Sequence, residues 1–509
     1  MKSRKVLALL LALSMISALV TACGSSSTPA VDSSAGESST ATSSVSEEAP
    51  KVEKPKSITL MVDGTFLIKE NGEAILEKGY EDLFGIDLII NHPVHNEYYE
   101  KVNLAFSSGN VPDVLIATSN YYLNFASNGA LYDITDLYEN SEIKNNVVDQ
   151  SIIDSIRVDG RLYGLPRERG NGTITYVRGD WMDKLGISNP TNYEEFLTML
   201  RRFKNENPDG LSPAEVIPIT SSGLVNSEFP LDIYLREFYW TATPDFVKRG
   251  DTWVDGMTED VMKDALQRMR DAYSEGLIDK EIITNQTSTC RDKFYAGTVG
   301  AFNYWAGTWN LNLHNNLTAN KPDATVVPIP PIKETKYVER APIPICITTN
   351  GPTSKTNPEG VFEYFLATLL DNGDGQNFWT FGVKGEEGSA TYTTDANGNI
   401  SMLPSVEDPK KNFTKAWEDP ALSITSFAPK FEFDPLISNS LEMFQSNMTV
   451  YSIFPTSEAI NDLLSELNSL KAKYVAKIVY SEVTIDEGLT QYTNEAKGMI
   501  EAILKDLNK

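Results

Sequence analysis

The chain has little of the residue types on which many enzymes and metal proteins depend. Its 509 residues include only three cysteines and three histidines. It contains no HExxH, GxSxG, Walker, CxxC or GxGxxG motif, so metalloprotease, serine hydrolase and nucleotide-dependent chemistry lack their usual sequence support. No cofactor is expected. Glycosidase chemistry leaves no short motif and stays open, because a pair of the 70 Asp and Glu residues would suffice.

The few cysteines give no sign of a metal site or a disulfide framework. After Cys23 only Cys290 and Cys346 remain, at no metal-ligand spacing. Two separate buried thiols are the favoured interpretation, and a disulfide between them is the alternative.

Positive charge is also scarce. Lys and Arg number 44, which gives a formal net charge of −26. Such a surface repels nucleic acid and anionic lipid headgroups, so neither is expected as a partner. No apolar run of about 18 residues, the length of a membrane span, occurs after the N-terminal segment.

That N-terminal segment, residues 1–22, has the features of an export signal. A start with two lysines and an arginine precedes the apolar run VLALLLALSMISALV at 6–20, which is too short to span a bilayer comfortably. The following VTAC at 20–23 resembles the lipobox of bacterial lipoproteins. The resemblance implies cleavage before Cys23 and acylation of its sulfur, and a secretory signal with a chance cysteine is the alternative.

Residues 23–57 are predicted to be a flexible tether. They are rich in Ser and Thr and contain no aromatic residue, so they cannot form a packed core. Two or more acyl chains hold a protein stably at a membrane. We therefore expect a protein on the outer face of the cytoplasmic membrane, held there by its lipid anchor alone. Removal of residues 1–22 takes away three positive charges, so the formal net charge of the mature chain is −29.

The remaining chain is long enough for two lobes, because one core rarely serves more than about 250–300 residues. At its start, β-rich runs alternate with helical stretches in the order strand, helix, strand, helix, strand. This order predicts a mainly parallel sheet with helices on its faces. The predicted elements are the strand SITLMVDG (57–64), a helix around 74–80, the strand GIDLIINH (85–92), a helix ending at Gly109, and the strand DVLIATS (113–119).

Ligands of such sheets bind at the carboxyl ends of the strands, which makes Asp63 and Ser119 candidate ligand contacts. Either residue is equally compatible with an ordinary turn. Further along, Thr191 and Glu194 have the spacing of a capping box, and a helix after them would place Phe196 and Leu200 on one face.

Several phrases resemble one family, the extracellular solute-binding proteins of bacterial ABC importers, family 1, and in particular its sugar and oligosaccharide lipoproteins. Each phrase is short, but together they follow the family's order along nearly the whole mature chain. The phrases are EKVNLAFSSGNVPDVL (100–115), VDGRLYGLPRERGNGTITYVRGDWMDKLGI (158–187), AYSEGLIDKE (272–281), KFYAGTVGAFNYWAGTW (293–309) and KIVYSEVTIDEGL (477–489).

The resemblance implies an α/β, two-lobed fold of the periplasmic-binding-protein-like type II class, with hinge crossovers between the lobes. On this sequence, lobe 1 would comprise 58–166 and a return segment at 344–426. Lobe 2 would comprise 167–343 and a completion at 427–509.

The same resemblance implies a monomeric binding protein and no enzyme. It would capture a sugar, an oligosaccharide or another polar small solute between its lobes and deliver it to ABC permease subunits in the membrane. A surface-anchored glycoside hydrolase is one alternative. A peptide-binding or sensor lipoprotein of the same fold is another.

A sugar site combines aromatic rings that pack on C–H faces with planar polar groups that bind hydroxyls. The segment FNYWAGTWN at 302–310 supplies both kinds, and Trp305 is the main candidate platform. The resemblance places Arg167 and Arg169 in the first crossover between the lobes. These arginines would clamp a carboxylate of the ligand, as in a uronic acid, or form salt bridges between the lobes. A structural role is favoured for Trp181. The other candidate ligand contacts are Asn303, Tyr304, Trp309, Arg167, Arg169, Trp240 and Trp181.

Related proteins often carry a calcium-type loop after the helix that follows the DW phrase. Here the corresponding run is NPDGLSPAEVIP at 207–218. Asn207 and Asp209 keep ligand oxygens, but Leu211 has none and Ser212 replaces the glycine of the tight turn. A bare turn without metal is therefore predicted.

Overall fold

The computed structural model divides the chain into two units, Met1–Lys51 and Val52–Lys509. All the residues that it describes belong to the second unit. Three candidate functional residues, Cys23, Arg167 and Arg169, lie outside the described part. The described residues are 52–64, 73–94, 97–166, 171–222, 224, 231, 233–340, 342–387, 389–403, 424–428, 430–450 and 458–508.

The first lobe contains a five-stranded sheet in the order β2-β1-β3-β12-β4. Strand β1 pairs in parallel with both β2 and β3, which confirms the sheet predicted from the alternating strands and helices. Strand β12 arrives much later in the chain and runs antiparallel to β3 and β4. The strands are β1 (Ser57–Met61), β2 (Asp87–Asn91), β3 (Val114–Ile116), β4 (Gly164–Pro166) and β12 (Pro344–Ile347).

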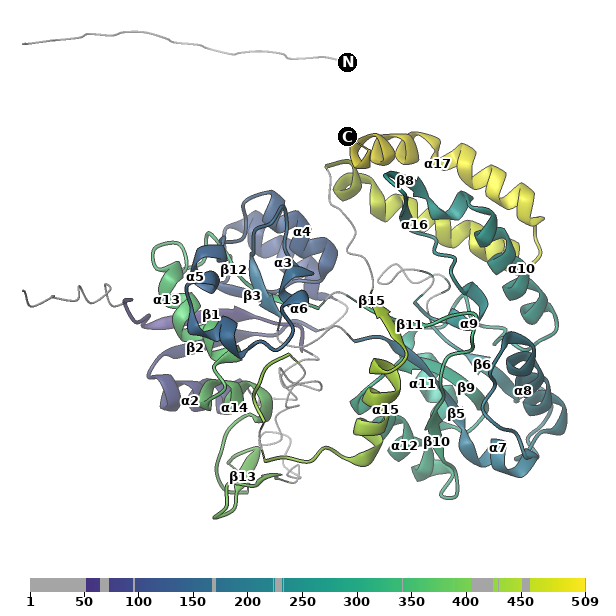
Figure 1. The fold of residues 1–509 in the computed structure, drawn as a ribbon, viewed down its shortest axis with the longest axis horizontal. Helices are drawn as coiled ribbons and strands as arrows, with labels where there is room; N and C mark the ends of the chain where they lie inside the picture. The colour runs from purple at the N-terminus through teal and green to yellow at the C-terminus, as the bar shows by residue number, and fades with distance from the viewer. Residues whose placement is uncertain are drawn as a thin grey trace, which may run out of the picture. The chain divides into compact units, whose positions relative to one another are not determined.

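Helices from distant parts of the chain pack around this sheet (Figure 1). Tyr80 of α2, for example, lies with its ring centroid 5.8 Å from that of Phe378 in α14. Helix α3 ends where predicted, at Gly109, which has a φ of 76°. The helices are α2 (Glu73–Phe84), α3 (Tyr98–Ser108), α4 (Ser119–Ser127), α5 (Thr135–Glu139), α6 (Gln150–Asp154), α13 (Pro358–Val361) and α14 (Asp374–Phe381), and a hairpin adds β13 (Tyr392–Thr394) and β14 (Ile400–Met402).

The buried carboxylate of Asp113 joins three segments of the first lobe. Its Oδ2 accepts hydrogen bonds from the N–H and the hydroxyl of Thr59 in β1, both at 2.8 Å. Its Oδ1 accepts from the backbone N–H groups of Thr353 at 2.6 Å and Ser354 at 2.7 Å. The side chain is fully buried. Asp113 thus fixes β1, the start of β3 and the turn after β12 to one another.

The second lobe contains a four-stranded sheet in the order β10-β5-β9-β6. Strands β5 and β9 are antiparallel, with Thr173 opposite Trp305 and Val177 opposite Ala301. Strand β6 is parallel to β9. The strands are β5 (Thr173–Arg178), β6 (Ile217–Thr220), β9 (Val299–Trp305) and β10 (Val326–Pro328), and two smaller pairs are β7 (Phe246–Arg249) with β8 (Thr252–Asp255) and β11 (Tyr337–Glu339) with β15 (Met448–Val450).

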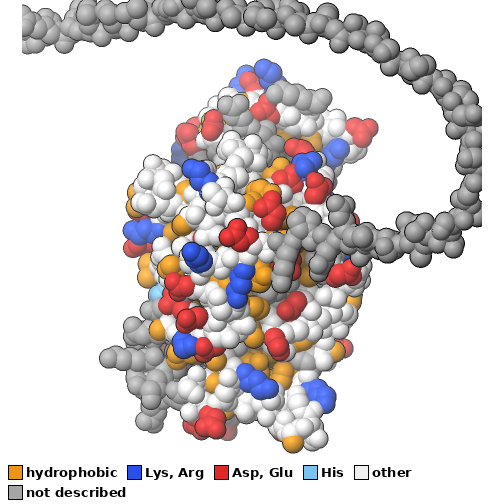
Figure 2. All heavy atoms as spheres, turned by 90° about the vertical axis from the view of Figure 1, so that its left-hand side faces the viewer, with side chains coloured by type: hydrophobic (Ala, Val, Ile, Leu, Met, Phe, Trp, Pro, Cys, Tyr) orange, Lys and Arg blue, Asp and Glu red, His pale blue; other side chains and the backbone are white. Residues whose placement is uncertain are grey.

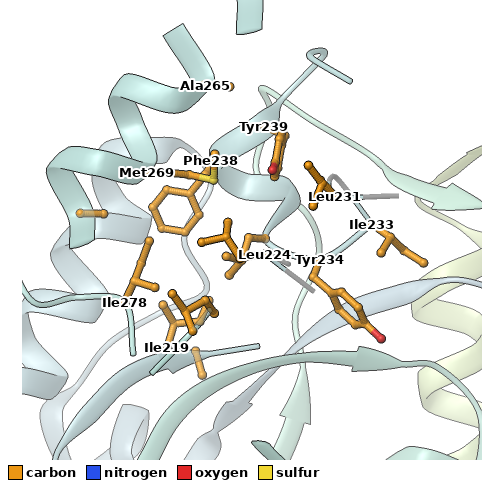
Figure 3. Close-up of a cluster of buried hydrophobic side chains, with 14 of the residues drawn as sticks. Ile219, Leu224, Leu231, Ile233, Tyr234, Phe238, Tyr239, Ala265, Met269 and Ile278 are labelled. Atoms are coloured by element: carbon orange, nitrogen blue, oxygen red, sulfur yellow. The ribbon is translucent and has the colours of Figure 1, made fainter. Parts of the chain in front are cut away.

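The core of this lobe lies between the sheet and its helices. Figure 3 shows one part of it, where the ring of Phe238 in α9 lies beside Met269 of α10 and above Leu224. Burial of such a side chain contributes about 1.5–3 kcal/mol. The helices are α7 (Gly179–Leu185), α8 (Tyr193–Glu206), α9 (Arg236–Tyr239), α10 (Asp260–Ser274), α11 (Thr287–Tyr295), α12 (Thr308–Asn320), α15 (Pro435–Gln445), α16 (Glu458–Val479) and α17 (Ile485–Leu507).

Helix α8 has the predicted apolar face but not the predicted cap. Phe196 and Leu200 are fully buried, as expected. The N-cap is Asn192, whose Oδ1 accepts from the N–H of Glu195 at 3.1 Å. Glu195 in turn accepts from the N–H and hydroxyl of Thr191. The prediction of a Thr191–Glu194 box was therefore wrong by one residue.

The chain passes between the two lobes three times, after β4, after β11 and after β14. At the third passage, Thr425 still pairs with Val147 and the carbonyl of Lys430 accepts from the N–H of Ile400 at 2.7 Å. After β14, the chain therefore still contacts the first lobe at Thr425 and at Lys430. The segment boundaries given by the resemblance remain predictions.

Cys290 and Cys346 are both buried and unpaired, which confirms the prediction of two separate thiols. Each lies in the core of a different lobe. Burial raises the pKa of Cys290 to about 12.

Within the described ranges, no helix combines the length and the apolar character that a membrane crossing requires. On the face shown in Figure 2, acidic and basic side chains are interspersed.

We predict that Asp113→Asn lowers the free energy of unfolding of the first lobe by about 2–4 kcal/mol. The amide retains one acceptor oxygen and turns its NH₂ group toward backbone donors that stay buried. Urea denaturation followed by circular dichroism measures the loss. Asp87→Asn, at an exposed position at the start of β2, is the matched control and should change stability by less than about 0.5 kcal/mol. Equal effects of the two substitutions would contradict this role of Asp113.

Candidate functional site

Strand β9 carries three of the candidate ligand contacts, Asn303, Tyr304 and Trp305. Its position depends on a close approach to two helices. At Gly300, a Cβ atom would lie 2.5 Å from the ring of Phe203 and 3.0 Å from that of Trp181. Only glycine allows this approach without a shift of those rings. The strand then ends at Trp305, and Gly307, with a φ of 83°, turns the chain into α12.

Trp305 is partly buried at the carboxyl end of β9, opposite Thr173 at the start of β5. Its carbonyl accepts a hydrogen bond from the hydroxyl of Tyr176 at 2.8 Å. The guanidinium of Arg340 lies 5.8 Å from the centroid of its ring. Thr173 follows the first passage between the sheets and Arg340 precedes the second. The predicted platform is therefore next to the segments that connect the two lobes.

Asn303 is almost fully buried, and both of its amide atoms are used inside the lobe. Its Oδ1 accepts from the N–H of Leu235 at 3.1 Å, and its Nδ2 donates to the hydroxyl of Thr175 at 2.6 Å. Thr175 in turn donates to the buried carboxylate of Glu237, and burial raises the pKa of that carboxyl. A ligand would have to replace these bonds to contact Asn303. In this structure Asn303 connects β9 to β5 and α9.

The side chain of Tyr304 lies on the face of β9 opposite to that of Asn303, and it is also almost fully buried. Its ring is stacked on Phe302, with centroids 4.9 Å apart, and meets Trp309 edge-on at 4.9 Å. Its hydroxyl accepts from Arg291 at 2.9 Å. Burial raises the pKa of Tyr304 to about 12, so the hydroxyl stays protonated at neutral pH.

Arg291, in α11, was not identified from the sequence. Its guanidinium lies 4.9 Å from the ring centroid of the partly buried Trp309 and 5.8 Å from that of Tyr304. Among the described residues, no Asp or Glu forms an ion pair with it. A single arginine in a helix has no sequence signal, because its ring partners come from the strand and helix that follow. Arg291, Tyr304 and Trp309 form one cluster, which we call the Arg291 cluster.

Trp240 and Trp181 both pack against neighbouring side chains. The Arg268 guanidinium lies 3.7 Å from the centroid of the Trp240 ring, and Tyr193 meets the same ring edge-on at 5.6 Å. Burial lowers the pKa of Arg268. Trp181 is fully buried and meets Phe203 edge-on at 5.5 Å, in agreement with the structural role favoured for it.

In the first lobe, the two predicted positions follow neighbouring strands. Asp63 comes two residues after β1 and is 6% exposed, whereas Ser119 is the first residue of α4 rather than the end of a strand. The rings of Tyr99 in α3 and Tyr121 in α4 are stacked, with centroids 3.7 Å apart. The Tyr99 hydroxyl accepts from the N–H of Thr118 at 2.6 Å. Its pKa is raised by burial and, to a smaller extent, by the charge of Asp63.

The two candidate metal ligands, Asn207 and Asp209, are engaged with other side chains and backbone groups. Asn207 bonds to Leu211 through both amide atoms, and Asp209 forms ion pairs with Arg178 and Lys184. Within the described ranges, no group of three or more His, Cys, Asp and Glu is placed to hold a metal ion.

Comparison with known proteins gives a family and a fold. The family model described as bacterial extracellular solute-binding protein matches residues 72–375. The alginate-binding protein AlgQ2, in a crystal structure without calcium ion, superposes with a TM-score of 0.63 at 19% identity and covers 90% of this chain and 98% of its own. The fold is therefore the type II periplasmic-binding-protein-like fold that the resemblance implied.

Two curated relatives match part of the sequence. Lipoprotein LipO of Bacillus subtilis (strain 168) is 26% identical over 231 residues, which cover 44% of this chain and 45% of LipO. The fructooligosaccharide ABC transporter substrate-binding protein FusA of Streptococcus pneumoniae serotype 4 is 26% identical over 255 residues, 46% of each chain. The chain thus spans less than half the length of the curated relatives it matches.

Proposed function

Because the chain belongs to the bacterial extracellular solute-binding proteins, we propose that it is the membrane-anchored substrate-binding component of an ABC importer. In this proposal it has no catalytic activity. It binds an oligosaccharide between its two lobes, closes around it and presents it to the permease subunits as a monomer. The lobes are the segments 58–166 with 344–426 and 167–343 with 427–509.

The observation that carries the oligosaccharide proposal is the partly buried indole of Trp305 at the end of β9. It lies beside the connecting segments, where a ligand held between two lobes would contact it. An aromatic face with a guanidinium nearby suits a sugar, because the ring packs on C–H groups and the guanidinium binds hydroxyls. Tyr99 and Tyr121 offer a second aromatic surface in the first lobe. FusA and AlgQ2 are named for oligosaccharide or polysaccharide binding, which agrees with this choice.

The Arg291 cluster favours a sugar that carries a carboxylate as a second, narrower candidate. Most described arginines of this acidic chain pair with Asp or Glu, for example Arg201 with Glu275 at 2.7 Å. Arg291 contacts aromatic groups instead, and one hydrogen bond to Tyr304 leaves further N–H donors available. A guanidinium beside an indole would bind a uronate through its carboxylate while the ring packs on the sugar face.

The anchor is proposed to be Cys23, acylated after removal of residues 1–22. The family is extracellular, and the matched relative LipO is named a lipoprotein. Acyl chains at the end of the 23–57 tether would keep the binding domain close to its permease on the outer face of the cytoplasmic membrane. A loaded molecule would then deliver its solute without being lost to the medium.

We predict that a panel of oligosaccharides contains at least one that raises the melting temperature of the purified mature chain, because a ligand that binds only the folded state stabilises it by mass action. Trp305→Ala should weaken that ligand at least about tenfold, equivalent to 1.4 kcal/mol, in isothermal titration. Trp253→Ala, at a partly buried tryptophan of β8, is the control and should keep wild-type affinity.

Three results would contradict this prediction. Unchanged affinity of Trp305→Ala would remove that ring from the site. A response to peptides and to no carbohydrate would replace the substrate class with the peptide-binding alternative. Hydrolysis products in a mixture of pure protein and oligosaccharide would support the glycoside hydrolase instead.

We predict that the wild-type chain binds an oligogalacturonate more tightly than a neutral galacto-oligosaccharide of the same length, by about tenfold and less so at high salt. Arg291→Met should abolish the preference, whereas Arg249→Met, an exposed arginine paired with Glu259, should retain it. Isothermal titration at two salt concentrations measures both. Equal wild-type affinities for the two sugars would refute the uronate candidate and leave the oligosaccharide proposal intact.

We predict that Cys23→Ala abolishes membrane attachment, because no thiol remains for acylation. Radiolabelled palmitate should enter the wild-type chain and not the variant. Cys290→Ala is the control and should leave labelling unchanged. Labelling of Cys23→Ala equal to wild type would contradict the anchor.

A further inference from the structure

The loop after α8 differs from the calcium-type loop that the resemblance implies at residues 207–218. Calcium requires about six to eight oxygen ligands in a loop that tightens at a glycine. Here Leu211 has no side-chain oxygen and Ser212 occupies the glycine position. The Oδ1 of Asn207 accepts from the N–H of Leu211 at 3.0 Å, and Glu215 accepts from the N–H of Ser212 at 3.1 Å and from its hydroxyl. The Oδ1 of Asn207, the hydroxyl of Ser212 and one carboxylate oxygen of Glu215 are thus engaged within the loop, and the residues do not fit calcium.

The remaining carboxylate, that of Asp209, is paired with two cations of the chain itself. Its Oδ2 lies 2.8 Å from Nη2 of Arg178, and its Oδ1 lies 2.8 Å from Nζ of Lys184. The carboxylate is about one tenth exposed, and Lys184 is half exposed. Both oxygens of Asp209 therefore already have a positive partner.

Arg178 is the last residue of β5, and its guanidinium is 1% exposed. It binds Asp180 through two parallel hydrogen bonds, Nε to Oδ1 at 2.8 Å and Nη2 to Oδ2 at 2.6 Å. Its Nη1 donates to the carbonyl of Gly297, just before β9, at 3.1 Å. A buried cation with two carboxylates and a carbonyl as partners has its charge and most of its N–H donors satisfied.

The cluster also joins separate parts of the second lobe. Asp180 accepts from the N–H of Thr325, next to β10, at 3.2 Å. Together, Arg178, Asp180, Lys184 and Asp209 connect the end of β5, the loop after α8, the start of β9 and the start of β10. We call these four residues the Arg178 latch.

We infer that the Arg178 latch replaces a divalent cation, so that the loop at 207–218 is closed by the chain's own charges and the second lobe folds independently of calcium. A guanidinium with a bidentate carboxylate supplies fixed geometry, and the ammonium of Lys184 supplies the second positive charge. This inference does not depend on which solute the protein binds.

The protonation of Asp209 agrees with this arrangement. Burial acts to raise its pKa, but hydrogen bonds from Lys184 and Arg178 and the positive charge of Arg178 outweigh it, and the pKa falls from 3.8 to about 2. A carboxyl whose pKa is lower in the folded state stabilises the fold above its unfolded pKa, and that contribution disappears as the pH falls through the folded value. The contribution of the Asp209 ion pairs to stability should therefore be complete above about pH 4 and be lost as the pH falls from about 4 to about 2.

The first test uses the purified mature chain and calcium alone. We expect the same melting temperature in excess CaCl₂ and in excess EDTA, and no saturable uptake of ⁴⁵Ca²⁺ in equilibrium dialysis. A rise of the melting temperature with calcium, a fall with EDTA, or stoichiometric uptake would overturn the inference.

The second test uses Asp209→Asn, which keeps the shape of the side chain and removes its charge. It should lower the melting temperature by about 2–4 °C at pH 7, and the difference from wild type should shrink as the pH falls from about 4 to 2. Asp183→Asn, an exposed position on the same helix as Lys184, is the matched control and should show neither effect. An Asp209→Asn variant as stable as wild type would overturn the latch.

Discussion

The antiparallel pairing of β5 with β9 is the constraint on which the rest of the second lobe depends. Its register places Thr173 opposite Trp305 at one end and Val177 opposite Ala301 near the other. The first end lies beside the segments that connect the lobes, and the second leads into Arg178. A shift of one residue would turn every side chain of β9 to the opposite face. The aromatic ring proposed to hold the ligand and the charge cluster that closes the loop are thus positioned by the same ladder of backbone hydrogen bonds.

The partners of the buried charged side chains show which of these side chains stabilise the fold. Asp113 is satisfied by backbone donors and a threonine hydroxyl, and Arg178 by two carboxylates and a carbonyl. Removing a charge from water is costly unless partners replace the water. Arg291 differs from these groups because its partners are aromatic rings and a phenol. This difference, rather than its position in the sequence, is what makes it a candidate for ligand recognition.

Local patterns predicted the elements of the fold well, because they depend on residues close together in the chain. The first three strands and two helices, the buried face of α8 and the end of α3 at Gly109 all agree with the sequence. The sequence predicted Thr191 as the N-cap of α8, but the structure has Asn192 there. Adjacent Asn and Thr side chains compete for the same backbone donors, so the pattern does not decide between them. Ser119 became the start of a helix, since β3 ends after three residues.

The candidate site was less predictable. Asn303 and Tyr304 are adjacent in a phrase rich in sugar-binding residue types, yet strand alternation sends them to opposite faces and into different networks. No spacing reveals that the Arg268 side chain covers Trp240, or that Arg291 lies against Trp309, because these partners meet only after helices pack on the sheet.

By itself, the sequence determined the family, the type II α/β fold and the expectation of an exported, lipid-anchored binding protein, because these depend on composition and on phrases in a fixed order. Only the tertiary structure decided which polar side chains form hydrogen bonds within a lobe and which ion pairs form. It buried Asn303 and Trp181, joined Arg178 to Asp209 across 31 residues of chain, and left Trp305 partly buried beside the connecting segments. The physical reason is that side-chain partners are chosen by strand register and helix packing, which bring together residues that no local pattern relates.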